Sequence, residues 1–394
     1  MTIADVKSQA TLRDGRWTPA PGFGIYLHVP FCRHRCHYCD FNTYEGQDAL
    51  HDDYVNALIA EIDRYGDSHP PATSVFFGGG TPTLLSPDQL RALLEAVRRR
   101  FDLIPDAEIT VEANPETLVS GYCNALLEAG FNRISIGVQS TVPHVLQGLG
   151  RTHDADRAID AILSAREAGF EDINADLIYG SPWESPADWH TSLDRVLAAE
   201  PDHISAYALT VEAGTPLATF VSSGRIPDVD PDVQAERHAT AEEVLSANGY
   251  ARYEVSNWAR PSRASRHNVL YWCAGDYVGF GAGAHSHVGG HRWWAARLPR
   301  AFIAAVAAGR STRDDEENLH NDGRAGEALM LGLRLKSGVD LDAFANLFGP
   351  DPLERRRPVL EEFQTSGFLK RELNWLSLTE RGTMLGNELM WRLL

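Results

Sequence analysis

Three of the five cysteines in this 394-residue chain, Cys32, Cys36 and Cys39, lie together in one short segment. Thiolates hold iron–sulfur clusters, usually with one thiolate on each iron. Three thiolates would leave one iron of a four-iron cluster with an open coordination position. An iron of that kind could bind a substrate directly.

Two other uses of these cysteines compete with a cluster. A structural zinc site needs four ligands, and His34 or His37 could complete a Cys3His set. The remaining cysteines, Cys123 and Cys273, are isolated and distant in the sequence. Disulfides are disfavoured because the chain is long and poor in cysteine. The spacing favours the cluster, and zinc is the main alternative.

The Cys-x3-Cys-x2-Cys spacing and the glycine motif at residues 78–83 resemble those of the radical S-adenosylmethionine (SAM) superfamily. Residues 26–32 and 39–41 are similar to the branch that contains the oxygen-independent coproporphyrinogen III oxidases and the haem chaperones related to them. The resemblance implies a [4Fe–4S] cluster whose unique iron chelates the amino and carboxylate groups of SAM. It also implies that the reduced cluster can cleave SAM to a 5′-deoxyadenosyl radical.

Residues 24–256 alternate short β-rich runs with amphipathic segments, which predicts a parallel sheet with helical crossovers. Six such units favour an incomplete (β/α)6 barrel, with an open Rossmann-like sheet as the alternative. The expected strands are 24–29, 73–77, 108–111, 133–138, 173–178 and 203–209. The expected helices are 53–64, 87–100, 118–129, 154–168 and 187–199.

Polar motifs follow these strands in register. The cysteine segment comes after the first strand, residues 78–83 after the second and residues 112–116 after the third, while Gln139 and Asp176 lie near the ends of the next two. The carboxyl ends of barrel strands converge over one mouth. We therefore expect a single site there.

The residue types in these motifs suit a zwitterionic nucleoside. A glutamate can accept a hydrogen bond from an ammonium group, an arginine can pair with a carboxylate, and amide or carboxylate oxygens can bond ribose hydroxyls. Adjacent glycines let the backbone approach a ligand closely. The family resemblance implies SAM contacts for Tyr26, Gly79, Gly80, Thr81, Glu112, Gln139, Arg151 and Asp176.

A second group of motifs follows the sixth strand. Residues 254–259, the segment His267-Asn-Val-Leu-Tyr-Trp272 and residues 279–286 resemble the haem-chaperone group in particular. Imidazole can ligate haem iron, and aromatic rings can stack on a porphyrin. His267, Tyr271 and Trp272 are therefore candidate haem-binding residues. The alternative is that His267 simply hydrogen-bonds a loop.

A second histidine cluster comprises His285, His287 and His291 in a glycine-rich segment. We expect a flexible loop at the barrel mouth here. Because the segment offers no matching cysteine or carboxylate, we expect these histidines to be solvated or hydrogen-bonded.

After about residue 299 the pattern changes. Helices are expected at 327–335, 341–348 and 352–364, then a hairpin around 373–374 and a last helix over 379–394, which together predict a small α+β winged-helix-like domain. The acidic balance favours a lid or docking role over DNA binding for this domain. The expected domains are an N-terminal lead (1–22), the barrel with a family-specific extension (23–299) and the C-terminal domain (300–394).

Bulk properties narrow the possible partners and location. The formal net charge of −18 argues against non-specific nucleic-acid binding. Apolar runs are shorter than the roughly 20 residues of a membrane helix, and residues 1–22 lack the apolar core of a secretory signal. We expect a cytoplasmic protein, and leave peripheral membrane association and a homodimer open.

Two functions of different classes follow from the resemblance. One is a haem chaperone, with cluster and SAM as cofactors, haem as bound cargo and haemoproteins as recipients; the other is the radical decarboxylation of coproporphyrinogen III. The similar oxidases carry a further cysteine two residues after Cys39, where this chain has Phe41, and a longer N-terminal arm. Both differences favour the chaperone, so we do not expect oxidase activity. A radical SAM enzyme for another substrate is a third possibility.

Overall fold

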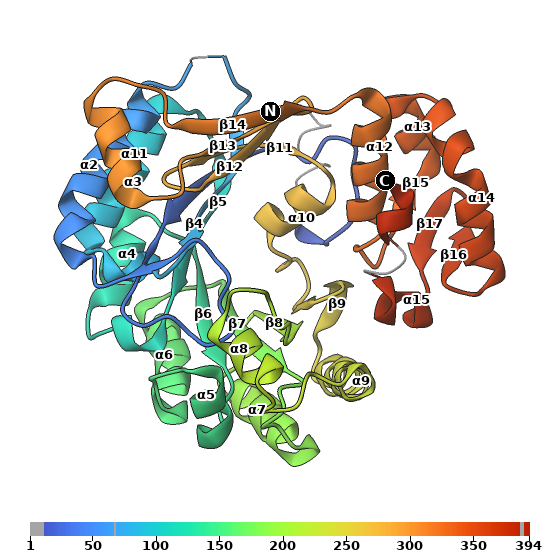
Figure 1. Ribbon diagram of the computed structural model, residues 1–394, viewed down its shortest axis with the longest axis horizontal. Coiled ribbons are helices and arrows are strands. Elements are labelled where there is room, and N and C mark those ends of the chain that lie inside the picture. The colour runs from blue at the N-terminus through green and yellow to red at the C-terminus, as the bar shows by residue number, and fades with distance from the viewer. Residues whose placement is uncertain (1–11, 67, 387–389) are drawn as a thin grey trace.

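Six parallel strands form the centre of the fold in a computed structural model that describes residues 12–66, 68–386 and 390–394 (Figure 1). They are β1 (Phe23–Val29), β4 (Ala72–Gly79), β5 (Leu103–Ala113), β6 (Arg133–Gln139), β7 (Ile173–Tyr179) and β8 (His203–Ala208). Neighbouring strands in the sheet are also neighbours in this order along the chain. All six predicted strands are confirmed.

Helices connect these strands and cover the outer face of the sheet (Figure 1). They are α2 (His51–Asp63), α3 (Pro87–Arg100), α4 (Tyr122–Ala129), α6 (Ala155–Ala168) and α7 (Pro186–Ala198). Ser86 and Ser185 each form a capping box that starts a helix, and Gly130 and Gly169 end helices in the left-handed conformation. The five predicted helices are confirmed. A short helix, α5 (Pro143–Leu149), was not predicted.

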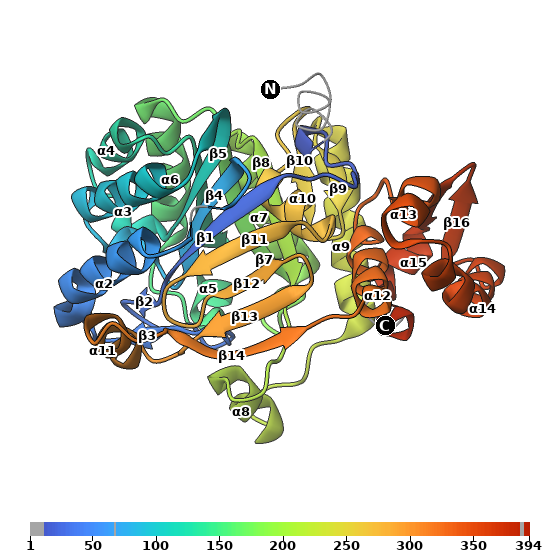
Figure 2. The same ribbon diagram turned by 90° about the horizontal axis from the view of Figure 1, so that it is seen from above.

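Additional strands extend the sheet at both edges to twelve strands. Beside β1, the strand β11 (Asp276–Phe280) pairs in parallel, followed by antiparallel β12 (His285–Val288), β13 (His291–Ala295) and β14 (Arg313–Asn318), which Figure 2 shows as an orange ladder. Beside β8 lie β10 (Asn257–Ala259) and β9 (Ala251–Glu254). The edge strands β14 and β9 do not pair with each other, so the barrel is incomplete.

The expectation of a flexible histidine-bearing loop is wrong. His285 and His287 lie on β12, and His291 begins β13, in a regular antiparallel hairpin. Only Gly289 and Gly290 form its turn, both with positive φ. The strands β12 and β13 were not predicted because the many glycines of residues 279–290 are more typical of a loop.

Four further helices belong to the segments around the extended sheet. They are α8 (Pro216–Ser222), α9 (Pro231–Ala247), α10 (Arg266–Trp272) and α11 (Pro299–Ala307). Unlike the crossover helices, α10 lies on the inner side of the curved sheet, near the C-terminal domain (Figure 1). No helix in the described ranges is long and apolar enough to cross a membrane.

The C-terminal region combines helices with a small sheet. It comprises α12 (Asn321–Gly332), β15 (Val339–Asp340), α13 (Leu341–Phe348), α14 (Asp351–Thr365), β16 (Leu369–Glu372), β17 (Trp375–Leu378) and α15 (Glu380–Met384). The hairpin turns at Leu373, which has a positive φ of 55° and is 91% exposed. The winged-helix-like arrangement is confirmed. Within the range predicted for the last helix, α15 ends at Met384 and Leu385 forms a turn, while residues 387–389 lie outside the described chain.

Two contacts of the segment before Asn318 bear on where the C-terminal domain begins. Strand β14 pairs with β13, and Phe302 of α11 is buried in the barrel core. We therefore propose that the C-terminal domain starts after Asn318. In the N-terminal lead, Leu12 and Trp17 pack into a second hydrophobic core that the C-terminal domain shares with α10.

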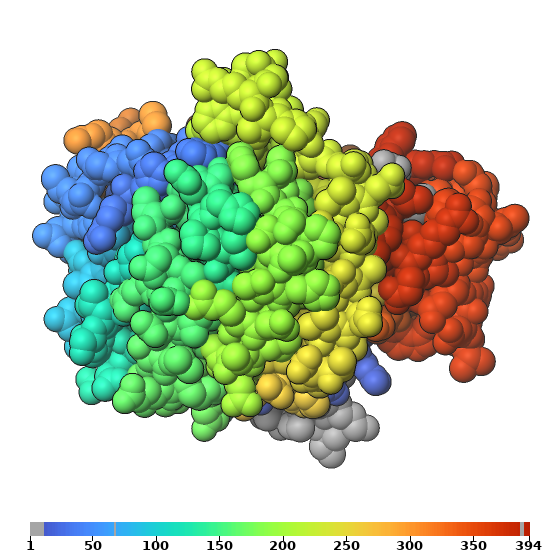
Figure 3. All heavy atoms as spheres, turned by 90° about the horizontal axis from the view of Figure 1, so that it is seen from below, coloured from blue at the N-terminus to red at the C-terminus, as the bar shows by residue number. Residues whose placement is uncertain are grey.

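The C-terminal domain also contacts the segment that follows the barrel strands. Figure 3 shows the domain, in red, against the yellow segment that contains α9 and β9. Arg252 forms ion pairs with Glu242 of α9 (3.0 Å) and with Glu380 of α15 (2.7 Å). Arg252 thus connects the two parts of the molecule through charge as well as through the apolar core.

Candidate functional site

The carboxyl ends of the six parallel strands surround a cavity of about 410 Å³. We call it the strand-end cavity. It is lined by all three clustered cysteines and seven of the eight predicted SAM residues: Cys32, Cys36, Cys39, Gly79, Gly80, Thr81, Glu112, Gln139, Arg151 and Asp176. Tyr26, the eighth, lines a neighbouring cavity. The ends of five strands, together with the segment after α5 that carries Arg151, thus bring the predicted residues together.

Hydrogen-bond donors contact two of the three cysteine sulfurs. The Thr81 hydroxyl donates to Cys32 Sγ (3.8 Å), and Arg151 Nη1 donates to Cys36 Sγ (3.4 Å). Burial raises the pKa of Cys32 to about 11, and the nearby Cys36 and Cys39 raise it by a smaller amount. Bound iron would offset this cost to the thiolate. The donors and the sulfur-only ligand set therefore fit an iron–sulfur cluster.

The arrangement of ligand types also bears on a single metal ion. Among the described residues, no three His, Cys, Asp or Glu side chains are grouped so as to hold one ion. A four-iron cluster does not require that grouping, because each thiolate binds a different iron.

The glycines after β4 have a structural role that the sequence did not suggest. A Cβ atom on Gly80 would lie 2.4 Å from the carbonyl oxygen of Phe31, and one on Gly79, where φ is +114°, would lie 2.6 Å from the His28 ring. The amides of Gly80 and Thr81 donate to the carbonyls of Val29 and Phe31. The missing side chains therefore let the end of β4 contact the start of the cysteine segment.

Glu112 forms no ion pair with any described residue. Its Oε2 accepts a hydrogen bond from Gly79 N (3.1 Å). Burial, with a smaller contribution from the Asp176 carboxylate, raises the pKa of Glu112 to about 8. A ligand ammonium in the strand-end cavity would stabilise its charged form.

The other polar residues of the cavity are held by their neighbours. Arg151 Nη2 donates to Asn114 Oδ1 (2.8 Å) and to the Gly137 carbonyl (3.0 Å). Asp176 accepts from Ser135 Oγ (2.9 Å) and from an Asn174 amide. These contacts orient the two charged side chains before any ligand binds.

Gln139 is positioned by its backbone. It has a positive φ of 65°, and the register between β6 and β7 shifts at this point. Positive φ is uncommon for a residue other than glycine, and such strained residues are concentrated at functional sites.

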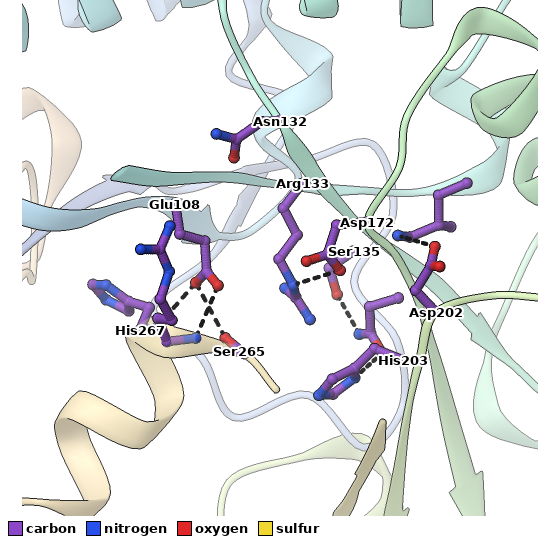
Figure 4. Close-up of polar contacts among 12 residues, drawn as sticks. Glu108, Asn132, Arg133, Ser135, Asp172, Asp202, His203, Ser265 and His267 are labelled. Atoms are coloured by element: carbon purple, nitrogen blue, oxygen red, sulfur yellow. Dashed lines mark hydrogen bonds and ion pairs between the residues drawn. The ribbon is translucent and has the colours of Figure 1, made fainter. Parts of the chain in front are cut away.

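Figure 4 shows a buried polar network that includes Glu108 and Arg133 of the barrel strands and the residues at the start of α10. Although burial opposes it, the guanidinium groups of Arg133 and Arg266 hold the pKa of Glu108 below its usual value. Glu108 accepts hydrogen bonds from the backbone amides of Arg266 (2.8 Å) and His267 (3.0 Å), at the start of α10. A barrel strand thereby fixes the helix that carries the predicted haem-binding residues.

Sequence reasoning missed this network, although a signal was present. Glu108, Thr110 and Glu112 alternate along β5, so all three side chains point to the same face. An alternating polar pattern on a strand that is otherwise buried indicates a polar barrel interior.

Of the predicted haem-binding residues, Tyr271 lines a cavity beside the strand-end cavity. His267 is 1% exposed, and its ring nitrogens lie 2.8 Å from Ser74 Oγ and 2.9 Å from the Tyr271 hydroxyl. Trp272 packs towards the C-terminal domain, with the Arg334 guanidinium 4.4 Å from its ring centre. His267 is thus buried in contact with the Tyr271 hydroxyl, and Trp272 points towards the C-terminal domain.

A second cavity, of about 650 Å³, adjoins the first. We call it the hairpin cavity, because β12 and β13 form one of its walls. Phe41, Gly79 and Glu112 line both cavities. The remaining lining residues include Tyr26, His28, Tyr271, Tyr277, His285, Trp294 and Arg297. The last three were not predicted as site residues; the histidine cluster beside two tryptophans was the available signal.

Comparisons with known proteins agree with this geometry. Residues 26–196 match the Radical SAM superfamily model, and residues 319–385 match the HemN C-terminal domain model. A solved structure of coproporphyrinogen III oxidase (HemN) from Escherichia coli, described as a radical SAM enzyme, is 23% identical with a TM-score of 0.82, covering 98% of this chain and 93% of that one. At that identity the likeness shows the fold.

Two bacterial relatives have higher sequence identity to this chain than the oxidase has. The "Heme chaperone HemW" of Mycobacterium tuberculosis is 42% identical over 383 residues, which are 95% of this chain and 96% of the relative. The protein of the same name from Bacillus subtilis is 35% identical, covering 92% and 97%. The chain therefore belongs to the HemW family of the radical SAM superfamily.

Proposed function

We propose that this protein is a haem chaperone that binds a [4Fe–4S] cluster and SAM in the strand-end cavity and haem in the hairpin cavity. The adjoining cavities, which share Phe41, Gly79 and Glu112 as a common wall, are the main support for the proposal. Both volumes lie in the range of about 300–1,000 Å³ that is usual for ligand sites. The name of the HemW relatives supports haem as the cargo.

We propose that Cys32, Cys36 and Cys39 hold the cluster, which supplies an iron with an open position. In this proposal Glu112 binds the SAM ammonium, and Arg151 lies on the side of the SAM carboxylate. Gln139 and Asp176 form hydrogen bonds to the ribose. The methionyl side of SAM is lined by Gly79, Gly80 and Thr81. Tyr26 closes the cavity near Glu112. The donors already present around the sulfurs and the carboxylate of Glu112 support these roles.

For haem, the element 267–272 is proposed to form one wall of the hairpin cavity. Tyr271 would contact the macrocycle, because it lines the cavity. His267 would hold the Tyr271 hydroxyl, and Trp272 would anchor the element against the C-terminal domain. Haemoproteins that accept the haem are the proposed partners.

The oxidase alternative depends on the residue after Asp40. Phe41 is 64% exposed and lines both cavities, at the position where the similar oxidases have a cysteine. A phenyl ring contributes apolar surface here and no thiol. This difference favours carriage of haem over decarboxylation of coproporphyrinogen III.

The first prediction concerns the cluster. Replacing Cys32, Cys36 or Cys39 with alanine should abolish the brown iron–sulfur chromophore of anaerobically reconstituted protein, because each thiolate holds one iron. The buried Cys123 and Cys273 provide matched controls, and their alanine variants should retain it. Full iron and sulfide content in Cys36→Ala, or stoichiometric zinc in the wild type, would contradict the assignment.

The second prediction concerns Glu112. In Glu112→Gln, SAM affinity measured by calorimetry should fall about tenfold or more, since a hydrogen bond to a charged group contributes roughly 1.5–3 kcal/mol. Iron and sulfide content should not change. Unaltered SAM affinity would remove Glu112 from the site.

The same variant should be more stable at high pH without SAM. A carboxyl group whose pKa rises from 4.5 to about 8 on folding holds its proton more tightly in the folded state. Its contribution therefore lowers the free energy of unfolding as pH increases from 4.5 to about 8. Urea unfolding should show that Glu112→Gln is more stable than the wild type near the upper end of this range and similar to it near the lower end.

The third prediction separates the two functions. Wild-type protein should bind about one equivalent of haem, as expected for a single hairpin cavity. It should form no protoporphyrinogen IX from coproporphyrinogen III when supplied with SAM and reductant. Turnover by the wild type that disappears in Cys32→Ala would establish the oxidase in place of the chaperone.

A further inference from the structure

We propose that His285 is the side chain that ligates haem iron in the hairpin cavity. This inference rests on the proposed function, because it names the ligand for the cargo. It differs from the expectation based on the sequence, which placed the candidate ligand at His267 and left His285 as a solvated or hydrogen-bonded residue.

The first observation is the state of the imidazoles near the cavity. A ring nitrogen can bind iron only if its lone pair is not already used. His28 uses both nitrogens, one with the Tyr26 hydroxyl and one with the Asn42 carbonyl, each at 2.9 Å. His267 also uses both, with Ser74 and Tyr271.

His285 differs from both of these histidines. It is exposed and lines the hairpin cavity, and neither of its ring nitrogens has a hydrogen-bond or ion-pair partner in the described part of the chain. Burial of part of the ring and the nearby Arg292 and Arg297 lower the pKa of His285 below its ordinary value. These effects favour the neutral imidazole, which is the form that coordinates a metal.

The second observation is that the backbone of His285 is held firmly. Residue 285 pairs with Trp294 across the hairpin, and the two rings stack with their centres 5.4 Å apart. A Cβ atom on Gly279 would lie 2.2 Å from the His285 carbonyl oxygen. Glycine is needed there for β11 to approach β12. The imidazole therefore projects from a rigid strand, as a preorganised ligand requires.

The same segment is fastened to the cysteine segment. The side-chain amide of Asn42 donates to the carbonyls of Ala282 (3.0 Å) and Arg297 (2.9 Å). A Cβ atom on Gly283 would lie 2.5 Å from that amide nitrogen. Asn42 lies three residues after Cys39. Its contacts therefore fix the position of His285 relative to the cysteines.

The third observation is that the other chemical groups of haem have partners in the same cavity. The guanidinium of Arg297 has no hydrogen-bond or ion-pair partner among the described residues, so it is available to a propionate carboxylate. Tyr271 and Tyr277 pack edge to face, 4.7 Å apart, and Trp294 lies beside His285. An imidazole, a cation and aromatic surfaces are the groups that recognise an iron porphyrin with carboxylate side chains.

Haemin titration of four proteins tests this inference: wild type, His285→Ala, His267→Ala and His287→Ala. His287 is the matched control, because it lies on the same strand near Asp276 and outside the lining of the cavity. Difference spectra against the haem-free protein cancel the absorption of the cluster. Iron and sulfide content and SAM binding verify that each variant is folded.

We expect His285→Ala alone to lose the Soret band of the wild-type complex and to bind haem at least about tenfold more weakly, a factor that corresponds to roughly 1.4 kcal/mol. Free imidazole should restore the band, because it can enter the space left by the side chain and ligate the iron. His285→Met should give a third spectrum, since it replaces nitrogen with sulfur. Arg297→Gln should weaken binding without a change of spectrum.

The possible failures are distinguishable. A wild-type protein that binds no haem would overturn the proposed function and this inference with it. Haem binding by the wild type with an identical spectrum in His285→Ala would overturn the inference alone. A spectral change confined to His267→Ala would return the ligand assignment to His267.

Discussion

The close contact between the end of β4 and the start of the cysteine segment is the constraint on which the proposed sites depend. Gly80 lies directly against the Phe31 carbonyl, where even a methyl group would clash. The contact fixes the position of the segment that bears the cysteines. It also positions Gly79, whose amide donates a hydrogen bond to Glu112 and which is part of the wall between the two cavities. Without it, neither cavity would have its common boundary.

The buried polar network includes charged groups whose removal from water is energetically unfavourable. Glu108 and Arg133 are 4% and 2% exposed, and burying charges is unfavourable unless they are paired and hydrogen-bonded. Here the pairing holds the first residues of α10 against the sheet. The charges therefore determine the position of Tyr271 at the hairpin cavity, although none of them lines it.

The sequence was sufficient to predict the six central strands and the strand-end cavity, because hydrophobic alternation and the convergence of strand ends are local and topological rules. It was not sufficient for the hairpin cavity. That cavity depends on β12 and β13, whose glycines suggested a loop, and on pairing between segments more than 200 residues apart, such as β1 with β11. Nor could the sequence reveal that the nitrogens of His267 are occupied, since Ser74 comes from a distant strand.

Iron anomalous diffraction from anaerobic crystals of the haem-loaded protein would test the account most directly. The account predicts a compact group of iron positions at Cys32, Cys36 and Cys39, and one separate iron in the hairpin cavity next to the imidazole of His285. An isolated iron outside that cavity, or no iron at the three cysteines, would contradict the arrangement of cluster and haem on either side of a shared wall.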